Sequence, residues 1–215
     1  MIVEEIMKTN VVTLHPMDSI ADAIQVMESH NIRHIPIVDD KEKLAGLVTI
    51  SKLKEIIPST FRTNENPEDL KKPLELIMEK NVITGHPLDF VEEVAAVFYE
   101  HKISCIPIIK DKKLVGILTE TDLLRTMVEL TGAHQPGSQI ELKVPNITGV
   151  LCDVAGIIRS RNANILSVLV YPDKQDEHMK ILVIRVQMMN PTGLIEDLKK
   201  AGHQVLWPNL PGITL

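Results

Sequence analysis

The feature that most constrains this chain is an internal repeat. Residues 5–53 match residues 76–123 with a shift of 71 positions, and one residue is lost in a charged turn. Within it, Ile35-Pro36-Ile37 recurs as Ile106-Pro107-Ile108. A copy of about 50 residues is too short to bury a sufficient core by itself. We therefore expect the two copies to pack against each other as one unit.

Each copy predicts the same order of elements: a short strand, a helix, two strands and a second helix. From Ile20 onward the apolar residues of the first helix follow the i, i+3, i+4, i+7 spacing of one helix face. Asp18 and Asp89 precede the two equivalent helices, and we expect each to cap its helix. The buried strands are expected at 35–38, 44–49, 106–109 and 114–119.

Both copies resemble the CBS repeat. They share Met-x-x-x-Val-x-Thr, then Ile-Pro-Ile, then Gly-apolar-x-Thr, and the second copy completes the pattern with Asp122. The resemblance implies an α+β fold in which two βαββα repeats form a disc-shaped pair, the Bateman module. It also implies two clefts that commonly hold adenosine nucleotides or adenosyl compounds. The expected boundaries are 1–60 for the first repeat, 61–75 for a linker and 76–131 for the second repeat.

The second copy carries the fuller set of ligand-binding residue types. Thr119 ends a strand beside a helix opening, where a hydroxyl and backbone N–H groups suit a phosphate. Asp122 has two oxygens that can accept from ribose hydroxyls, although a carboxylate there can also act only as a helix cap. The resemblance implies AMP, ADP, ATP or an adenosyl compound as regulatory ligand. It places around the adenine Val82, Thr84, His86, Cys105, Ile106 and Pro107.

The first copy departs from this pattern. Lys52 stands where the ribose carboxylate is expected, and a lysine has three donors and no acceptor. Arg33 and His34 add positive charge nearby, so this cleft is either empty or takes a more anionic ligand in a different way. We expect it to be empty. The residues assigned to this second cleft are Thr13, His15, Arg33, His34, Pro36, Thr49 and Lys52.

A linker composition at 132–137 marks the start of a different pattern. Residues 138–215 predict a βαββαβ order, which is typical of a ferredoxin-like fold. The turn that ends in Gly149-Val150-Leu151 resembles the ACT domain, a module that often binds amino acids or small metabolites at a dimer interface. The resemblance implies ligand contacts from Asn146, Gly149, Leu151 and Ile165. Asn146 and Gly149 have an equally good alternative role in turn geometry and capping.

The ACT-like part also predicts a homodimer. Two helices can cover only one face of a four-stranded sheet, and the central strands carry too many aliphatic residues for that face alone. An exposed aliphatic face marks an interaction site, and a twofold arrangement is the commonest way to bury it. The residues expected to compete for the covered positions are Val168, Val170, Leu182 and Ile184.

Composition and charge exclude several functional classes. The net charge of -6 and the aromatic content of 3% argue against a surface that binds nucleic acid. No apolar run approaches the roughly 20 residues that span a membrane, and acids stand near the N-terminus where a signal peptide has basic residues. We therefore expect a cytoplasmic protein with no membrane partner and, from the aliphatic neighbours of Cys105 and Cys152, free thiols.

No motif for catalysis or metal binding is present in the sequence. The eight histidines lack His-x-x-x-His spacing, and neither a Gly-x-Ser-x-Gly elbow nor a P-loop occurs. We therefore predict a regulatory protein with no metal, no catalytic residues and no cofactor, which acts on an unknown partner. The domain order resembles bacterial acetoin-utilisation proteins, which implies a role in acetoin or butanediol breakdown. The alternatives are an enzyme or enzyme subunit of acetoin metabolism, or a transcriptional regulator.

Overall fold

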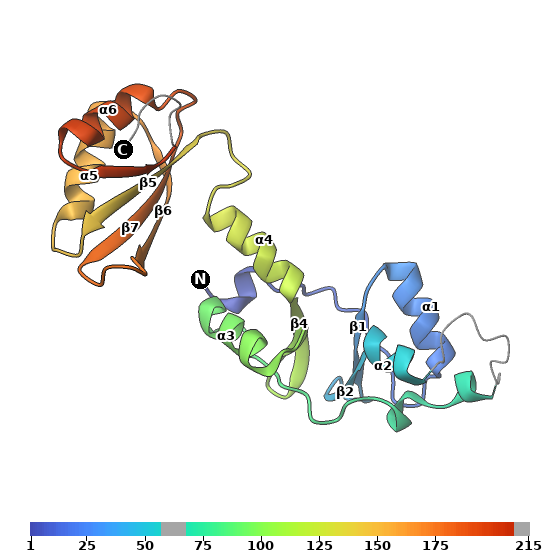
Figure 1. Ribbon diagram of the computed structural model, residues 1–215. Helices are drawn as coiled ribbons and strands as arrows, with labels where there is room; N and C mark the ends of the chain where they lie inside the picture. Colours follow the sequence, from blue (N-terminus) through green and yellow to red (C-terminus); the bar gives the residue numbers. More distant parts are fainter. Residues whose placement is uncertain (57–67, 209–215) are drawn as a thin grey trace. The chain divides into compact units, whose positions relative to one another are not determined.

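A computed structural model describes residues 1–56 and 68–208, and the chain divides into two compact units, Met1–Leu124 and Arg125–Leu215 (Figure 1). The predicted linker at 61–75 lies partly outside the described residues. The linker predicted at 132–137 belongs to the second unit, where the carbonyl of Thr131 accepts from the Ser167 hydroxyl at 2.8 Å. The boundary between the units falls inside a helix, α4, described below.

The first unit contains the two repeats in the predicted order. Each repeat has two antiparallel strands between two helices, preceded by a short 3-10 helix. The strand expected before each first helix is reduced to one parallel bridge, Leu14 with Ile37 and Gly85 with Ile108. The elements are η1 (Val3–Glu5), α1 (Ile20–His30), β1 (His34–Val38), β2 (Leu44–Thr49), α2 (Ile50–Ile56), η2 (Asp69–Lys71), η3 (Leu74–Leu76), α3 (Val91–His101), β3 (Cys105–Lys110), β4 (Lys113–Thr119) and α4 (Glu120–Leu130).

The prediction that Asp18 and Asp89 cap the helices is wrong. Each carboxylate instead accepts the backbone N–H three residues earlier, that of His15 or His86, at 2.7 Å. It therefore closes the His-Pro turn and is not placed at the helix end. The N-cap of α1 is Ser19, in a reciprocal capping box with the residue three positions on, and the N-cap of α3 makes no side-chain hydrogen bond.

The two repeats are joined by an exchange of their N-terminal segments. Val3, from the start of the first repeat, is fully buried in the core of the second repeat. Leu74, from the start of the second repeat, is fully buried in the core of the first. Backbone bridges of Lys8 with Ile117 and of Glu79 with Leu47 hold the two segments on the other repeat's strand. Neither core is complete without the other repeat, which confirms that the repeats pack as a pair.

A glycine stands at each crossing, the point where an exchanged segment passes over a strand of the other repeat. A Cβ on Gly116 would lie 2.5 Å from the sulfur of Met7, and a Cβ on Gly46 would lie 2.7 Å from that of Met78. These glycines occupy equivalent positions in β4 and β2, as the two methionines do in the exchanged segments. The close approach explains why Gly recurs in the motif of both repeats.

The second unit has the predicted βαββαβ order. Its four strands are antiparallel in the order β6-β7-β5-β8, and Figure 1 shows both helices on one face of the sheet. The core fills the space between that face and the helices. The elements are β5 (Ser138–Pro145), α5 (Val150–Ser160), β6 (Ile165–Pro172), β7 (Met179–Val186), α6 (Thr192–Lys200) and β8 (Gln204–Trp207).

The crossing generates a prediction about Gly116. The change Gly116→Ala should lower the free energy of unfolding of the first unit by about 1–3 kcal/mol, because the added methyl overpacks the contact with Met7. Urea unfolding of the full chain measures the loss. Gly156→Ala is the control, because Gly156 lies in α5 of the other unit and a Cβ there meets nothing within 4 Å. Equal stability of Gly116→Ala and the wild type would contradict the tight crossing.

Candidate functional site

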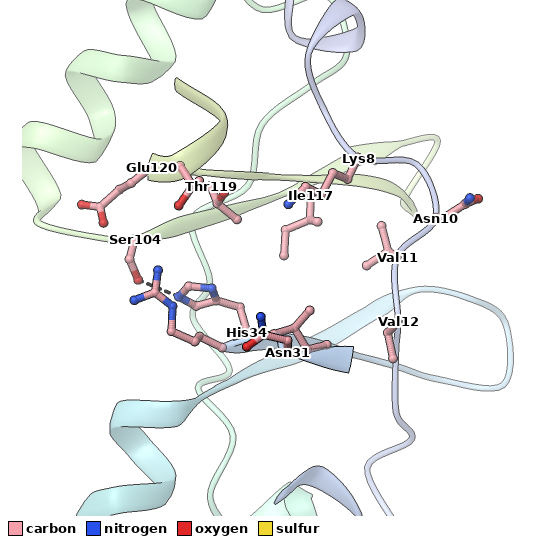
Figure 2. Close-up of a pocket in the computed structure, with 13 residues that line it drawn as sticks. Lys8, Asn10, Val11, Val12, Asn31, His34, Ser104, Ile117, Thr119 and Glu120 are labelled. Carbon is pink, nitrogen blue, oxygen red and sulfur yellow. Dashed lines mark hydrogen bonds between the residues drawn. The ribbon is translucent and has the colours of Figure 1, made fainter. Parts of the chain in front are cut away.

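Two clefts lie between the repeats. The first, cleft A, has walls from the exchanged N-terminal segment, from the residues before β1, and from β4 with the opening of α4 (Figure 2). Ile117 and Thr119 extend into it from β4, facing His34 across the cavity. Cleft A is lined by Lys8, Asn10, Val11, Val12, Asn31, Ile32, Arg33, His34, Ser104, Ile117, Thr119, Glu120 and Thr121.

The second cleft, cleft B, repeats this arrangement with the roles of the two repeats exchanged. The 71-residue shift converts Asn10 and Val11 of cleft A into Asn81 and Val82 of cleft B. The shift of 70 after the charged turn converts Thr119 into Thr49. Cleft B is lined by Leu47, Thr49, Ser51, Glu79, Asn81, Val82, Ile83, His101, Lys102, Ile103, Ser104 and Cys105, and an adjoining hollow adds Lys52 and Glu55.

Asp122 lies behind the wall of cleft A. Its carboxylate accepts the N–H of Thr119 at 3.0 Å and also the Thr119 hydroxyl, while Thr119 Oγ1 lies 3.4 Å from the N–H of Asp122. The two residues therefore form a capping box at the start of α4. The ammonium of Lys8 lies 3.4 Å from the other carboxylate oxygen, and only 3% of the Asp122 side chain is exposed. Lys8 thus separates Asp122 from a ligand in the cleft.

Three backbone donors at the opening of α4 already have protein partners. Thr119 N–H donates to Asp122, Glu120 N–H donates to the carbonyl of Ser104 at 3.2 Å, and Asp122 N–H donates to the Thr119 hydroxyl. Lys8 and Arg33 supply two cations in the lining.

His34 is a half-buried polar group of cleft A. Its Nε2 lies 2.7 Å from the hydroxyl of Ser104, a residue that lines both clefts (Figure 2). Burial, and after it the positive charge of Arg33, lowers the pKa of His34 to about 4. The imidazole is therefore neutral at pH 7, and it can donate or accept one hydrogen bond on each nitrogen according to its tautomer.

The structure regroups the residues that the sequence assigned to the two clefts. Val82 and Cys105, predicted beside Thr119, line cleft B, whereas Arg33 and His34, predicted beside Lys52, line cleft A. The reason is the exchange of N-terminal segments, which builds each cleft from both repeats. Sequence order alone had grouped each cleft within one repeat.

Several predicted residues line neither cleft. Ile106 and Pro107 are buried in β3, and Pro36 is buried in β1. The ring nitrogens Nδ1 of His15 and His86 accept backbone N–H groups within their own turns, at 3.3 and 3.2 Å. Two further residues lie elsewhere: Thr84 lines a separate hollow beside Lys43, Lys80 and Lys112, and Thr13 lies in the segment before α1.

Lys8, Asn10, Asn31 and Glu79 line the clefts but were missed in the sequence. The signal that could have found two of them is the repeat itself. Lys8 and Glu79 are equivalent under the 71-residue shift and differ in charge, as Asp122 and Lys52 do. These two reversals of charge can be read from the aligned repeats in the sequence.

Three of the residues predicted to bind a ligand in the ACT-like part, Asn146, Gly149 and Leu151, lie at the start of α5. The fourth, Ile165, begins β6 at the opposite end of the sheet, because it pairs with Val186, whereas Pro145 beside Asn146 pairs with Met179. Gly149 is the N-cap of α5 with φ of 94°, a conformation that favours glycine, and Asn146 donates its backbone N–H to the carbonyl of His178 at 2.8 Å. Leu151 is 45% exposed, whereas Ile165 packs against the core. The arrangement shows the turn geometry for Gly149, and a ligand role remains a prediction.

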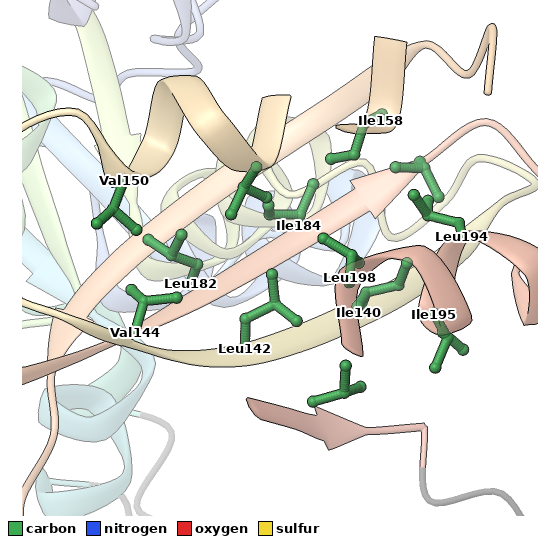
Figure 3. Close-up of a cluster of buried hydrophobic side chains, with 13 residues drawn as sticks. Ile140, Leu142, Val144, Val150, Ile158, Leu182, Ile184, Leu194, Ile195 and Leu198 are labelled. Atoms are coloured by element: carbon green, nitrogen blue, oxygen red, sulfur yellow. The ribbon is translucent and has the colours of Figure 1, made fainter. Parts of the chain in front are cut away.

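Of the four residues expected to compete for the helix-covered face, three pack beneath it and Val170 does not. Leu182 and Ile184 are 3% and 1% exposed and lie under α5 and α6 (Figure 3). Val168 packs against the same core, and Val170 is 47% exposed on the edge strand β6. The residue left exposed therefore lies on β6, an edge strand of the sheet, whose second half is exposed. The exposed apolar side chains of this unit include Leu169, Val170 and Tyr171 on that strand.

Within residues 1–56 and 68–208, no group of three or more His, Cys, Asp or Glu side chains is arranged to hold a metal ion. Over the same residues, no helix has the length and apolar character needed to cross a membrane.

Comparison with known proteins identifies the parts of the chain. The CBS domain model matches residues 3–59 and 74–129, and the ACT domain model matches residues 138–203. A Vibrio cholerae protein named for acetoin utilization (AcuB) is 31% identical, with a TM-score of 0.54 over 63% of this chain and 98% of that one. The CBS domain pair of protein MJ0100, solved with 5′-methylthioadenosine and S-adenosyl-L-methionine, is 32% identical, with a TM-score of 0.52 over 63% and 98%.

A curated relative is an enzyme. The L-aspartate semialdehyde sulfurtransferase of Methanocaldococcus jannaschii is 34% identical over 125 residues, which are 58% of this chain. The match spans 23% of the length of that enzyme.

The lowered pKa of His34 predicts a pH dependence of stability. Between about pH 6.5 and pH 4 the unfolded chain binds a proton at this residue and the native chain does not, so the free energy of unfolding should fall as the pH falls. His34→Gln removes that difference, so its stability should fall less over the same window. Urea unfolding at about pH 7 and about pH 4.5 measures both. The prediction fails if the two proteins lose the same stability.

Proposed function

We propose that this chain, which belongs to the CBS-domain proteins and carries a C-terminal ACT domain, is a non-catalytic regulator. Its CBS pair senses an adenosine-containing ligand. The observation that carries the proposal is cleft A. It combines apolar walls with a hydroxyl, amides and two cations at the junction of both repeats. A ligand there contacts both repeats at once, so its binding energy favours one arrangement of the pair.

The chemistry of cleft A suits a nucleotide or adenosyl compound. Val11 and Ile117 offer apolar surface for a purine, and the amides of Asn10 and Asn31 offer donors and acceptors. Lys8 and Arg33 suit a phosphate if the ligand is AMP, ADP or ATP. The MJ0100 domain pair, similar over the same part of the fold, was solved with two adenosyl compounds, which supports this class.

Asp122 acts in the proposal as the ribose acceptor. The Asp122 carboxylate already accepts from Thr119, so a ligand hydroxyl would be an additional partner. Lys8 must move from its position 3.4 Å from the carboxylate, or share it with the ligand.

The rest of the proposal concerns the pathway, the ACT domain and the cell. The similarity to AcuB supports a regulatory role in acetoin or butanediol catabolism, through a protein partner. The ACT domain takes an amino acid or another small metabolite near Asn146 and Gly149. The site of action is the cytoplasm.

An enzyme or enzyme subunit is the alternative, because the similar sulfurtransferase is an enzyme. A turnover assay with acetoin and redox cofactors distinguishes this alternative. A transcriptional regulator is the second alternative, and a mobility-shift assay at low salt tests it against the net charge of -6.

The proposal predicts the effect of Asp122→Ala on ligand binding. The variant should lose about 1.5–3 kcal/mol of the binding free energy for the adenosine ligand in cleft A, the value of hydrogen bonds to a charged group. Calorimetric titration of the full chain with AMP and with S-adenosylmethionine measures the loss. Asp40→Ala removes an exposed carboxylate outside the clefts and should bind as the wild type does. If Asp122→Ala binds with unchanged affinity, the carboxylate is only a helix cap.

We also propose that the protein is a homodimer joined at β6 of the ACT domain. Edge strands present unpaired backbone groups, and the second half of this edge strand is apolar on both faces. Leu169, Val170 and Tyr171 are 43%, 47% and 44% exposed. A second copy pairing with this strand would bury all three side chains and satisfy the edge.

The dimer proposal is tested by a charge on the edge strand. Leu169→Lys should convert the full chain from a dimer to a monomer of about 24.1 kDa, because the lysine must be desolvated in the interface. Light scattering after size-exclusion chromatography measures the mass. Met189→Lys, at an apolar residue that is 82% exposed outside the strand, is the matched control. A Leu169→Lys dimer as stable as the control places the contact elsewhere.

A further inference from the structure

A hollow that the proposed function does not use lies where the two β-hairpins of the first unit meet. The hairpins β1–β2 and β3–β4 contact each other there through a backbone bridge between Lys43 and Lys113. The polar side chains that line the hollow are Lys43, Lys80, Thr84 and Lys112, and all of them are exposed. Among the described residues, the hollow shares no lining residue with cleft A and shares Val82 alone with cleft B. It is therefore separate from both clefts.

The repeat supplies an internal comparison for this hollow. Under the shift of 70 residues that follows the charged turn, Lys43 and Lys112 correspond to Lys113 and Glu42, with the two repeats exchanged. Glu42 and Lys112 occupy the same left-handed turn position, with φ of 61° and 67°. On the equivalent side the ammonium of Lys113 lies 2.7 Å from the carboxylate of Glu42. At the hollow an ammonium stands in place of that carboxylate.

The positive charges of Lys43 and Lys112 are not neutralised by ion pairs. Over the part of the chain that the structure describes, neither ammonium has a carboxylate oxygen within ion-pair distance. Asp39 precedes Lys43 by four residues, but its carboxylate accepts the backbone N–H of Lys43 at 2.8 Å and so closes its own turn. The two ammonium groups are therefore the cations that a ligand in the hollow meets.

The groups of the hollow suit a phosphate. A lysine ammonium binds phosphate as a point charge with three donors, and the Thr84 hydroxyl adds a neutral donor. Lys80 brings a third ammonium, which is partly neutralised by Glu75 at 3.6 Å. Two like charges beside one hollow repel each other, and an anion between them removes that repulsion. A chain with a net charge of -6 thus has a local site for an anion.

We propose that this hollow binds the phosphate group of a small molecule, with Lys43 and Lys112 as the two cations and Thr84 as a hydrogen-bond donor. Free phosphate and a small phosphorylated metabolite share this chemistry. The site does not depend on the ligand proposed for cleft A. Because its lining comes from the hairpins of both repeats, a bound phosphate favours one arrangement of the pair.

The test is calorimetric titration of the full chain with inorganic phosphate, with pyrophosphate and, separately, with glycerol phosphate, all at constant ionic strength. The wild type should bind at least one of these probes in the hollow, and the tighter of the inorganic and organic probes identifies the source. Lys112→Glu should weaken that binding by at least about tenfold, because it creates the charge pair seen between Lys113 and Glu42. Lys112→Arg keeps the charge and should still bind the probe.

Two controls separate the site from net charge and from folding. Lys174→Glu makes the same change in net charge at an exposed lysine of the second unit and should bind as the wild type does. Glu42 shows that this turn position accepts a glutamate, so Lys112→Glu without probe should melt no lower than the wild type. If it does melt lower, Lys43→Gln serves as the second variant and should show the same loss of binding.

The contrary outcomes are distinct. Equal weakening by Lys112→Glu and Lys174→Glu indicates a general effect of net charge and overturns the site. Binding that is lost in Arg33→Ala but kept in Lys112→Glu places the phosphate in cleft A and also overturns it. A wild type that binds none of the three probes overturns it as well. Each of these results leaves the titration of Asp122→Ala with AMP or S-adenosylmethionine as an independent test of the proposed function.

Discussion

The structure of the first unit depends on the burial of Val3 in the second repeat and of Leu74 in the first. Both side chains are fully buried, and each fills a core that belongs to the other repeat. Burying a side chain of this size contributes about 1.5–3 kcal/mol. The burial also fixes the path of the chain. The segment that follows each buried side chain, which contains Met7 or Met78, lies across the neighbouring strand of the other repeat.

The clefts follow from this exchange. The segment that leaves Val3 reaches β4 at Lys8 and continues past Val11, so it forms one wall of cleft A while the residues before β1 form the other. Cleft B arises in the same way from the segment after Leu74. Each cleft is therefore bounded by both repeats, and Ser104 contributes to both. A ligand in either cleft contacts the whole unit.

Apolar spacing was sufficient to predict the order of the helices and of the paired strands in both units, because a period of 3.6 or 2 is read directly from the chain. The strand expected before each first helix of the repeats is only a single bridge. The residues of the clefts were harder. Thr119 and Thr49 were predicted because a hydroxyl at a strand-to-helix junction is a local feature. The assignment of Arg33 and His34 was wrong because it depended on which repeat supplies the opposite wall of the cleft. Local sequence does not show which strand an exchanged segment contacts.

The exchanged segments also have a consequence for how such a chain can change over generations. A single repeat would have an unfilled core. If two identical copies were on separate chains, the rate and the extent of their pairing would depend on the protein concentration. Fusion into one chain makes the assembly unimolecular. It also breaks a symmetry: in a dimer of identical copies, a substitution at the position of Lys8 appears in both clefts at once. After duplication the two positions vary independently, which is the condition under which one cleft can hold Lys8 with Asp122 while the other holds Glu79 with Lys52.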